Sequence, residues 1–264
     1  MTSHLSSSDE TGEATLDDFL GGRVRAWQPC DGPRSGIDAV ILAAAIPVRE
    51  GKRETVLEAG ASTGVVSLAV AERAGDAEVT AVEIQPDLAA LARRNADLNG
   101  MADRLRVVEV DITGPWKTFD EAGLRQASFR HVAANPPFYD PARSRKPGTP
   151  SKTRAHQAAP AELDRWLRFC AGMAMPGATL TLIHRPEMLP ELLAAIGRRF
   201  GGLIVFPLFP SAGKPATRML VQGMKGSRAP LQLMRGLVLH GDDGGFTPEA
   251  EAILRNGRVL DLNG

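Results

Sequence analysis

The chain has 264 residues, of which 43% are hydrophobic and 23% are charged. This composition excludes a disordered chain and allows a substantial core. The 31 basic and 31 acidic residues balance, which excludes a uniformly basic nucleic-acid-binding protein but leaves room for a local basic patch. Cys30 and Cys170 are too few for a disulfide framework or a zinc site, so we expect both to be apolar packing residues and expect no metal.

Residues 1–18 are polar and acidic, without the apolar stretch that a signal peptide needs. No run of about 18 apolar residues occurs that would predict a transmembrane helix. We therefore expect a cytoplasmic protein with no membrane partner, whose first 18 residues form a disordered tail.

Short β-rich runs alternate with helical stretches along most of the chain. The expected strands are Arg23–Gln28, Glu54–Glu58, Glu78–Glu83, Arg104–Val110, Phe129–Ala134, Ala178–His184, Leu203–Leu208 and Met219–Met224. The expected helices are Asp38–Ala45, Val65–Ala74, Pro86–Asn99, Pro160–Met173 and Pro186–Arg199. Strands that alternate with helices of this length are typical of βαβ units in a parallel sheet.

We therefore predict an α/β fold with a doubly wound, mostly parallel, seven-stranded, Rossmann-like sheet. Because one continuous sheet accounts for the whole span, residues 19–264 are expected to form a single domain. Within it, residues 19–50 form a small N-terminal cap and residues 51–264 the Rossmann-like core. Right-handed crossovers between parallel strands place helices on both faces of such a sheet.

A glycine-rich turn follows the first core strand. Gly60, Ser62 and Gly64 lie between that strand and a predicted helix, and open α/β sheets bind ligands at the carboxyl ends of their strands. Glycines there let the backbone approach a ligand closely. On its own such a turn is weak evidence, because close packing of helix and strand also requires glycine.

An acid stands at the end of each of three successive strands. Glu83, at the second strand, is placed to accept the hydroxyls of a ribose. Glu58, at the first, is placed to contact the charged amino-acid end of a cofactor, directly or through water. Asp111, after the third, is placed to accept a hydrogen bond from an adenine amino group. The alternative interpretation is three solvated strand-end carboxylates.

Acids outnumber bases around this turn, and its spacing differs from the Gly-x-Gly-x-x-Gly of pyrophosphate-binding sites. Both features favour S-adenosylmethionine, which carries a sulfonium and an ammonium group but no phosphate. The segment EAGASTG, Glu83 and Asp111 resemble, in order and spacing, the motifs of the class I S-adenosylmethionine-dependent methyltransferases. That family usually has glycine where this chain has Ser62.

The tetrapeptide Asn135-Pro136-Pro137-Phe138 follows the fourth core strand, beside the expected cofactor. The prolines stiffen the loop, so the Asn135 side-chain oxygen and the Pro136 carbonyl are placed to accept from one NH2 group. An exocyclic amine is a poor nucleophile because its lone pair is delocalised into the ring. Two acceptors out of the ring plane favour a tetrahedral nitrogen, and Phe138 is placed to stack on the base. A rigid turn without chemistry is the alternative.

The sequence Asn/Asp-Pro-Pro-aromatic is shared by methyltransferases that act on adenine N6, cytosine N4 and glutamine amides, so it indicates the reaction and not the substrate. SGIDAVIL at 35–42, KGSRAPL at 225–231 and FTPEA at 246–250, together with NPPFYDP, resemble the bacterial tRNA(Val) adenine-N6 methyltransferase family over roughly residues 18–262. That resemblance implies methylation of the adenine next to the anticodon, and places Asp38 over the cofactor pocket. The expected cofactor contacts are Asp38, Glu58, Gly60, Ser62, Gly64, Glu83, Ile84, Asp111, Ile112 and Asn135.

A basic segment without acids, residues 141–161, follows the tetrapeptide directly. Phosphate contacts from such a loop position a nucleic acid without reading its sequence. A second basic group near the C-terminus extends this expectation to Lys214, Arg218, Lys225 and Arg228. The residues expected to bind the tRNA partner are Tyr139, Arg143, Arg145, Lys146, Lys152 and Arg154. A solvated loop that binds nothing is the alternative.

Three other functions remain open at this point. A methyltransferase for a protein glutamine or for ribosomal RNA would use the same chemistry, but residues 1–50 are too short for the additional recognition domain expected of either. A nicotinamide-dependent oxidoreductase would share the Rossmann-like fold. A non-catalytic RNA-binding module would have no use for Asn135 beside the three acids.

Overall fold

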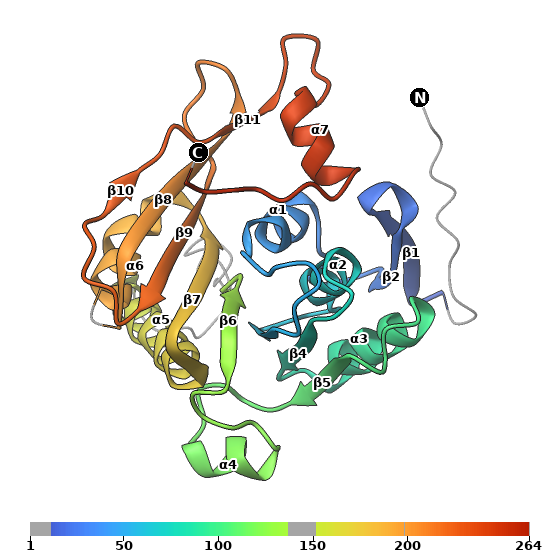
Figure 1. The fold of residues 1–264 in the computed structure, drawn as a ribbon, viewed down its shortest axis with the longest axis vertical. Helices are drawn as coiled ribbons and strands as arrows, with labels where there is room; N and C mark the ends of the chain where they lie inside the picture. The colour runs from blue at the N-terminus through green and yellow to red at the C-terminus, as the bar shows by residue number, and fades with distance from the viewer. Residues whose placement is uncertain (1–11, 137–151, 198, 264) are drawn as a thin grey trace.

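The structure, a computed structural model, describes residues 12–136, 152–197 and 199–263, with only the backbone of residues 152–160 (Figure 1). Its strands are β1 Ala14–Phe19, β2 Val24–Pro29, β3 Thr55–Ala59, β4 Glu78–Glu83, β5 Leu105–Glu109, β6 Phe129–Ala134, β7 Ala174–His184, β8 Phe200–Ser211, β9 Arg218–Lys225, β10 Gln232–Leu233 and β11 Leu237–His240. Its α-helices are α1 Ile37–Ala45, α2 Val65–Arg73, α3 Pro86–Leu98, α4 Trp116–Glu121, α5 Lys152–Met173, α6 Leu189–Ile196 and α7 Pro248–Leu254. Two short 3-10 helices are η1 Leu20–Gly22 and η2 Pro186–Met188.

Strands β3 to β11 form one large sheet with the order β10-β8-β9-β7-β6-β3-β4-β5, and β11 also pairs with β8. Strand β9 is antiparallel to its neighbours β7 and β8, and the other pairs are parallel. This confirms the doubly wound, mostly parallel sheet. The seven strands expected correspond to β3–β9, and the described residues add β10 and β11, so that the sheet has nine strands.

The strand order reverses between β3 and β6. From β3 the chain builds outward through β4 and β5, then returns to place β6 on the other side of β3. The two strands pair in register, Glu58 with Ala133 and Ala59 with Ala134. Gly60 and Asn135 each follow this last pair, so the glycine-rich turn and Asn135 leave the sheet side by side. Open α/β sheets bind ligands at this kind of switch point.

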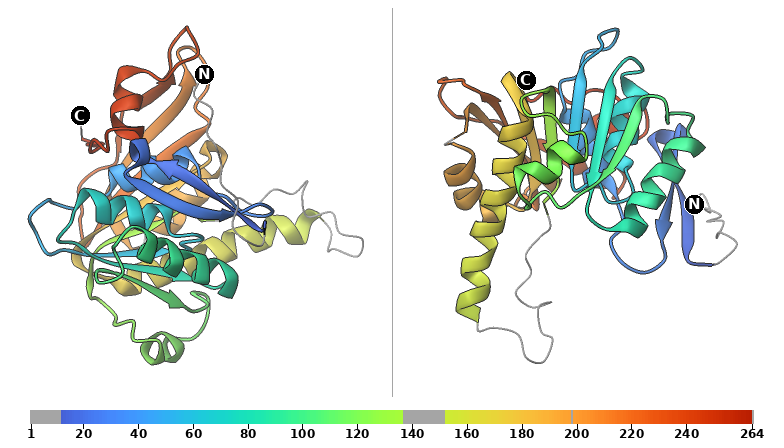
Figure 2. Two further views of the ribbon diagram at one scale, coloured as in Figure 1. Left: turned by 90° about the vertical axis from the view of Figure 1, so that its right-hand side faces the viewer. Right: turned by 90° about the horizontal axis from the view of Figure 1, so that it is seen from below.

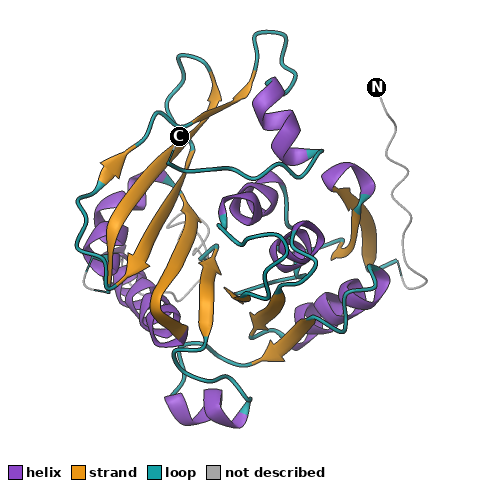
Figure 3. Ribbon diagram, in the orientation of Figure 1, coloured by secondary structure: helices purple, strands orange, loops and turns teal. Residues whose placement is uncertain are grey.

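Helices cover both faces of the sheet, as Figure 3 shows in purple around the orange strands. Successive strand residues alternate between the faces, so Val56 packs in a core with α1 and α2 while Leu57 packs in a second core with α4, α5 and α6. Both residues are almost completely buried. Because both faces are covered, the interior of each central strand is buried apart from a few polar residues.

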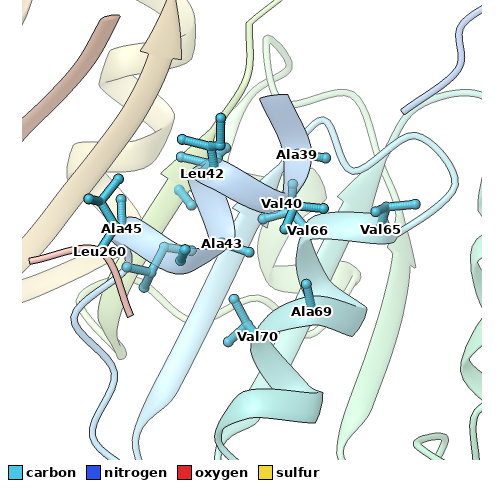
Figure 4. Close-up of a cluster of buried hydrophobic side chains, with 14 of the residues drawn as sticks. Ala39, Val40, Leu42, Ala43, Ala45, Val65, Val66, Ala69, Val70 and Leu260 are labelled. Atoms are coloured by element: carbon cyan, nitrogen blue, oxygen red, sulfur yellow. The ribbon is translucent and has the colours of Figure 1, made fainter. Parts of the chain in front are cut away.

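Helices α1 and α2 pack against each other through small side chains. Figure 4 shows Val40 and Ala43 of α1 beside Val66, Ala69 and Val70 of α2. All five are buried. Because alanine and valine allow helices to approach closely, α1 lies directly on the core and carries the segment before it to the edge of the cofactor turn.

A buried amide is one of the contacts that join the N-terminal cap to the core. The hairpin of β1 and β2 lies beside α3 (Figure 1). Asn95 of α3 accepts from the Trp27 backbone N–H at 2.7 Å and donates to the Trp27 carbonyl at 3.0 Å and the Thr63 carbonyl at 2.9 Å. Since Thr63 belongs to the glycine-rich turn, this side chain connects the cap, α3 and the turn.

Several expectations need correction. Residues 14–18, assigned to the tail, belong to β1, because they pair with β2 and bury Ala14. The basic loop expected at 141–161 is helical from Lys152, because α5 begins there and not at 160. The helix expected at Pro186–Arg199 is a 3-10 turn followed by α6, which ends at Ile196 before Gly197. Cys170 is buried as expected, whereas Cys30 is exposed at the end of the hairpin.

Replacing Asn95 with alanine should destabilise the protein by about 2–4 kcal/mol, because the Trp27 and Thr63 backbone groups lose their partner inside the fold. Urea unfolding measures the change in free energy. The matched control is Asn263→Ala, an exposed asparagine near the C-terminus, which should change stability by less than about 0.5 kcal/mol. Equal effects of the two substitutions would contradict the role given to Asn95.

Candidate active site

A cavity of about 950 Å³ opens at the carboxyl ends of the parallel strands. Its floor comes from the turns after β3, β4, β5 and β6. Its sides come from residues 33–39, from α5 and from the ends of β8, β9 and β11. Nine of the ten expected cofactor residues line it: Asp38, Glu58, Gly60, Ser62, Glu83, Ile84, Asp111, Ile112 and Asn135. Residues from segments far apart in the sequence therefore meet in one space.

Glu58 lies at the bottom of the cavity with 3% of its surface exposed. Its Oε2 accepts from the Ser67 backbone N–H at 2.9 Å and from the Ser67 hydroxyl at 2.5 Å, in the first turns of α2. Burial raises the pKa of Glu58 from 4.5 to about 8, the bonds from Ser67 lower it in part, and the charge of Glu83 raises it further. Before a cation enters the cavity, the buried carboxyl holds its proton at neutral pH.

The turn around Gly60 has no space for a side chain. Gly60 has φ +70°, and a Cβ placed on it would lie 2.3 Å from the ring of Trp166 in α5. Trp166 also lines the cavity. A residue other than glycine would therefore displace the indole from the cavity wall. Sequence reasoning did not identify Trp166, because nothing in the helical pattern of α5 distinguishes a cavity-lining residue from a core residue.

Ser62 occupies the position where the family usually has glycine, and the backbone explains that preference. Ser62 has φ +50°, in the left-handed region that costs a non-glycine residue about 1–2 kcal/mol. This conformation brings its N–H to within 2.7 Å of Glu83 Oε2. The other oxygen of Glu83 accepts from the backbone N–H groups of Ile84 and Gln85, both at 2.9 Å. The carboxylate that faces the expected ribose is therefore held rigidly.

Asp111 and two isoleucines line the part of the cavity beyond Glu83. Asp111 Oδ1 accepts from the Thr113 N–H and hydroxyl, both at 2.8 Å, and Oδ2 has no partner within the described ranges. Ile84 is 55% exposed and Ile112 is 8% exposed, and both line the cavity. An exposed apolar side chain next to a free carboxylate oxygen suits a flat heterocycle that carries an amino group.

Asn135 lies directly after β6 and lines the cavity. Its Oδ1 is buried, and among the described residues it has no hydrogen-bond partner. A buried amide oxygen without a partner is costly unless a ligand completes it. Pro136 also lines the cavity. Pro137, Phe138 and Tyr139 lie outside the described residues, as do Arg143, Arg145 and Lys146. The side chains of Lys152 and Arg154 are not described either.

Two expected residues have other surroundings. Gly64 does not line the cavity. Its φ is +84°, and a Cβ there would approach the Ala92 side chain to 3.3 Å, so this glycine serves the packing of α2 on α3. Asp38 does line the cavity, where Oδ2 accepts from Arg218 Nε at 2.6 Å. Arg218 was expected on the outer basic surface, and its ion pair instead connects the start of α1 to the start of β9.

The residues present suit S-adenosylmethionine. Five acids line the cavity: Asp38, Glu58, Glu83, Asp111 and Glu162. Against them stand Arg34 and Arg218, each paired with an aspartate. Ser62 and Asn135 line the cavity, and their buried side-chain oxygens have no partner in the described structure. A cationic ligand with several hydrogen-bond donors would balance the acids and would give these two oxygens a partner.

The strand order and the cavity at the β3–β6 switch point are those of an open α/β sheet that binds a nucleotide-like ligand. A family model described as a methyltransferase domain matches residues 56–140. A crystal structure of a predicted O-methyltransferase from Agrobacterium tumefaciens aligns with 84% of this chain and 97% of that chain, at 34% identity and a TM-score of 0.71. The chain belongs to the class I S-adenosylmethionine-dependent methyltransferases, and S-adenosylmethionine is its cofactor. The nicotinamide-dependent alternative is therefore ruled out.

Curated relatives carry a more specific name. A tRNA1(Val) (adenine(37)-N6)-methyltransferase from Shewanella loihica is 33% identical over 103 residues, which are 39% of this chain and 40% of that protein. One of the same name from Proteus mirabilis is 25% identical over 228 residues, which are 82% of this chain and 84% of that protein. The chain thus spans about two fifths of the first relative and most of the second. No described helix is long and apolar enough to cross a membrane.

The Glu58 carboxyl should make stability depend on pH in a way that Glu58→Gln abolishes. Its pKa is higher in the folded protein than in the unfolded chain, so its contribution is fully present below about pH 4.5 and is lost as the pH rises to about 8. The stability of the wild type relative to the variant should fall by about 1.4 kcal/mol per pH unit across that window. Urea unfolding of both proteins at a series of pH values measures this difference. Parallel pH profiles would contradict it.

Proposed function

We propose that the protein transfers a methyl group from S-adenosylmethionine to the exocyclic N6 of an adenine in tRNA, next to the anticodon of a valine tRNA. The observation that carries the proposal is Asn135, which lines the cofactor cavity and whose buried Oδ1 has no partner in the described structure. An amine with two N–H groups is the group that such an oxygen and a neighbouring backbone carbonyl accept together.

In this proposal the protein acts by position and not by acid–base chemistry. S-adenosylmethionine supplies the electrophilic methyl group. Asn135 Oδ1 and the Pro136 carbonyl accept the two amino hydrogens out of the plane of the ring. The nitrogen lone pair then leaves the ring system and faces the methyl group. When bound, the donor would lose its S–CH3 bond as the N–CH3 bond forms, so that S-adenosylhomocysteine leaves as a thioether and the methylated nitrogen releases one proton to water. Such alignment lowers the barrier by several kcal/mol because the reacting atoms are already in line. Phe138, which follows in the tetrapeptide, is proposed to stack on the base.

The tRNA substrate is supported by the relatives. The Proteus mirabilis protein, aligned over 82% of this chain, is named for adenine 37 of a valine tRNA, and an Aeromonas hydrophila protein of the same name is 25% identical over 80% of this chain. The resemblance at SGIDAVIL, NPPFYDP and FTPEA points to the same family. Adenine must leave the stack of the anticodon loop to reach Asn135, as single-stranded bases do in other protein–RNA complexes.

The Agrobacterium tumefaciens structure is described as a predicted O-methyltransferase, which makes a hydroxyl substrate the second candidate. Methylation of a hydroxyl needs a group that removes its proton. Asn135 has no such capacity, since an amide does not titrate. Asn135, which follows β6 and lines the cavity, is a neutral acceptor and therefore favours an amine.

Asn135→Ala should lower kcat for methyl transfer by about a hundredfold or more, because the amine loses an acceptor that acts mainly in the transition state. The dissociation constant of S-adenosylmethionine should rise by less than about tenfold, since Glu58, Glu83 and Asp111 remain. Asn256→Ala, an exposed asparagine after α7, is the control and should leave kcat unchanged. Full activity in Asn135→Ala would exclude the mechanism, because it would show that Asn135 takes no part in catalysis.

The substrate is tested by incubating the protein with labelled S-adenosylmethionine and tRNA that lacks the modification. Nucleoside analysis should place the label in N6-methyladenosine from a valine tRNA. Label in ribosomal RNA or in a protein amide would favour the alternative amino methyltransferases. Label in a 2′-O-methylated or other O-methylated product would favour the second candidate.

A further inference from the structure

A second hollow adjoins the active-site cavity at the hairpin between β8 and β9. It encloses about 680 Å³ and is lined by Arg185, Glu187, Ser211, Lys214, Thr217 and Arg218, with prolines and an alanine of the same hairpin. We call it the β8–β9 groove. Pro210, Thr217 and Arg218 line both spaces, so the groove is continuous with the cavity that contains Asn135.

The groove lies at the same edge of the sheet as the active site. Met219 at the start of β9 pairs with His184 at the end of β7, and Arg185 follows directly. The carboxyl ends of the parallel strands and the β8–β9 hairpin therefore meet at one edge (Figure 1). A polymer whose one unit enters the cavity has its next units at this hairpin.

Its lining has more basic than acidic side chains. Arg185, Lys214 and Arg218 line it with one acid, Glu187; Arg218 is paired with Asp38 of the cavity, and Lys214 and Glu187 are exposed. The Ser211 and Thr217 hydroxyls add neutral hydrogen-bond groups. Cations beside hydroxyls contact phosphate oxygens and fix the register of a nucleic acid without reading its bases. This contrasts with the acid-rich cavity, so the two adjoining spaces suit ligands of opposite charge.

The basic residues expected near the C-terminus to bind RNA lie at two opposite edges of the sheet. Lys225 donates to the carbonyls of Ala171 and Ala174, both at 2.7 Å, and so stabilises the end of α5. It pairs with Phe200 at the start of β8, at the opposite edge of the sheet. Arg228 follows there. Lys214 and Arg218 alone remain near the active site, and Arg185, which the sequence did not single out, joins them.

We propose that the β8–β9 groove binds the sugar–phosphate backbone of single-stranded RNA beside the nucleotide whose base enters the cavity. The proposal rests on the function proposed above and adds where that substrate lies. The base passes the shared residues Thr217 and Arg218, while the neighbouring phosphates stay outside against Arg185 and Lys214. The acidic wall of the cavity keeps the phosphates from following the base.

The test compares Arg185→Ala/Lys214→Ala with the matched pair Arg228→Ala/Lys52→Ala. Lys52 lies before β3, at the amino ends of the strands, so the control removes one arginine and one lysine from the far edge. Fluorescence anisotropy with an unmodified anticodon stem-loop of valine tRNA measures binding at several salt concentrations. The groove variant should bind about tenfold more weakly, and its log–log salt slope should fall by about 0.7 per lost phosphate contact.

The control pair should match the wild type in affinity and in slope. An equal loss of RNA affinity in both double variants would overturn the proposal, because binding would then depend on the net charge of the protein and not on the groove. A third variant, Glu187→Gln, removes the acid of the groove and should strengthen binding severalfold. A lower RNA affinity of Glu187→Gln would also overturn the proposal. Competition by polyglutamate as effective as that by RNA of equal charge would assign the groove to an acidic polypeptide.

Methyl transfer separates failure of the groove from failure of the proposed function. With tRNA as substrate, the groove variant should raise KM about tenfold and leave kcat within about twofold, since Asn135 is unchanged. If the wild type methylates tRNA and the groove variant has the wild-type KM, the groove proposal fails and the function stands. If the wild type methylates only another substrate while the groove variant alone loses RNA affinity, the function fails and the groove stands.

Discussion

The in-register pairing of β3 with β6 is the constraint on which the rest of the site depends. Glu58 and Ala133 are paired, and so are Ala59 and Ala134, so the cofactor turn and Asn135 leave adjacent strands at the same level. A shift of one residue would turn every side chain of β6 to the other face. It would also exchange the residues that pack in the two cores, which share these strands. The packing on both faces therefore fixes the position of Asn135.

The polar side chains of the site are held rigidly, but two of them lack a ligand that would stabilise them. Glu83 is held by three backbone N–H groups and Glu58 by Ser67, so neither side chain has to change its orientation when a cofactor binds. Yet Glu58 has a raised pKa and Asn135 Oδ1 lacks a partner in the described structure. A cation and an amine are the groups that relieve these two conditions. Preorganised acceptors of this kind are an effective source of catalysis.

Much of the fold follows from local sequence rules. The bounds of β4 and β6 match the prediction, because each short run ends within three residues of a proline, Pro86 or Pro136, which breaks a strand. The strand-end acids were found because one edge of a parallel sheet collects them. Trp166, Arg185 and the Asp38–Arg218 pair were not placed beforehand, because their meeting depends on tertiary packing between segments that no local pattern connects. Gly64 was assigned to the ligand because a turn glycine looks the same whether a helix or a ligand approaches it.

The central claim is that Asn135 and Pro136 accept the amino group that is methylated. A crystal structure of the protein with S-adenosylhomocysteine and adenosine monophosphate tests it most directly. The account predicts the adenine N6 within hydrogen-bond distance of Asn135 Oδ1 and of the Pro136 carbonyl, with the cofactor ribose hydroxyls at Glu83. An adenine whose amino group lies away from Asn135, or a cofactor whose ribose does not contact Glu83, would contradict the account.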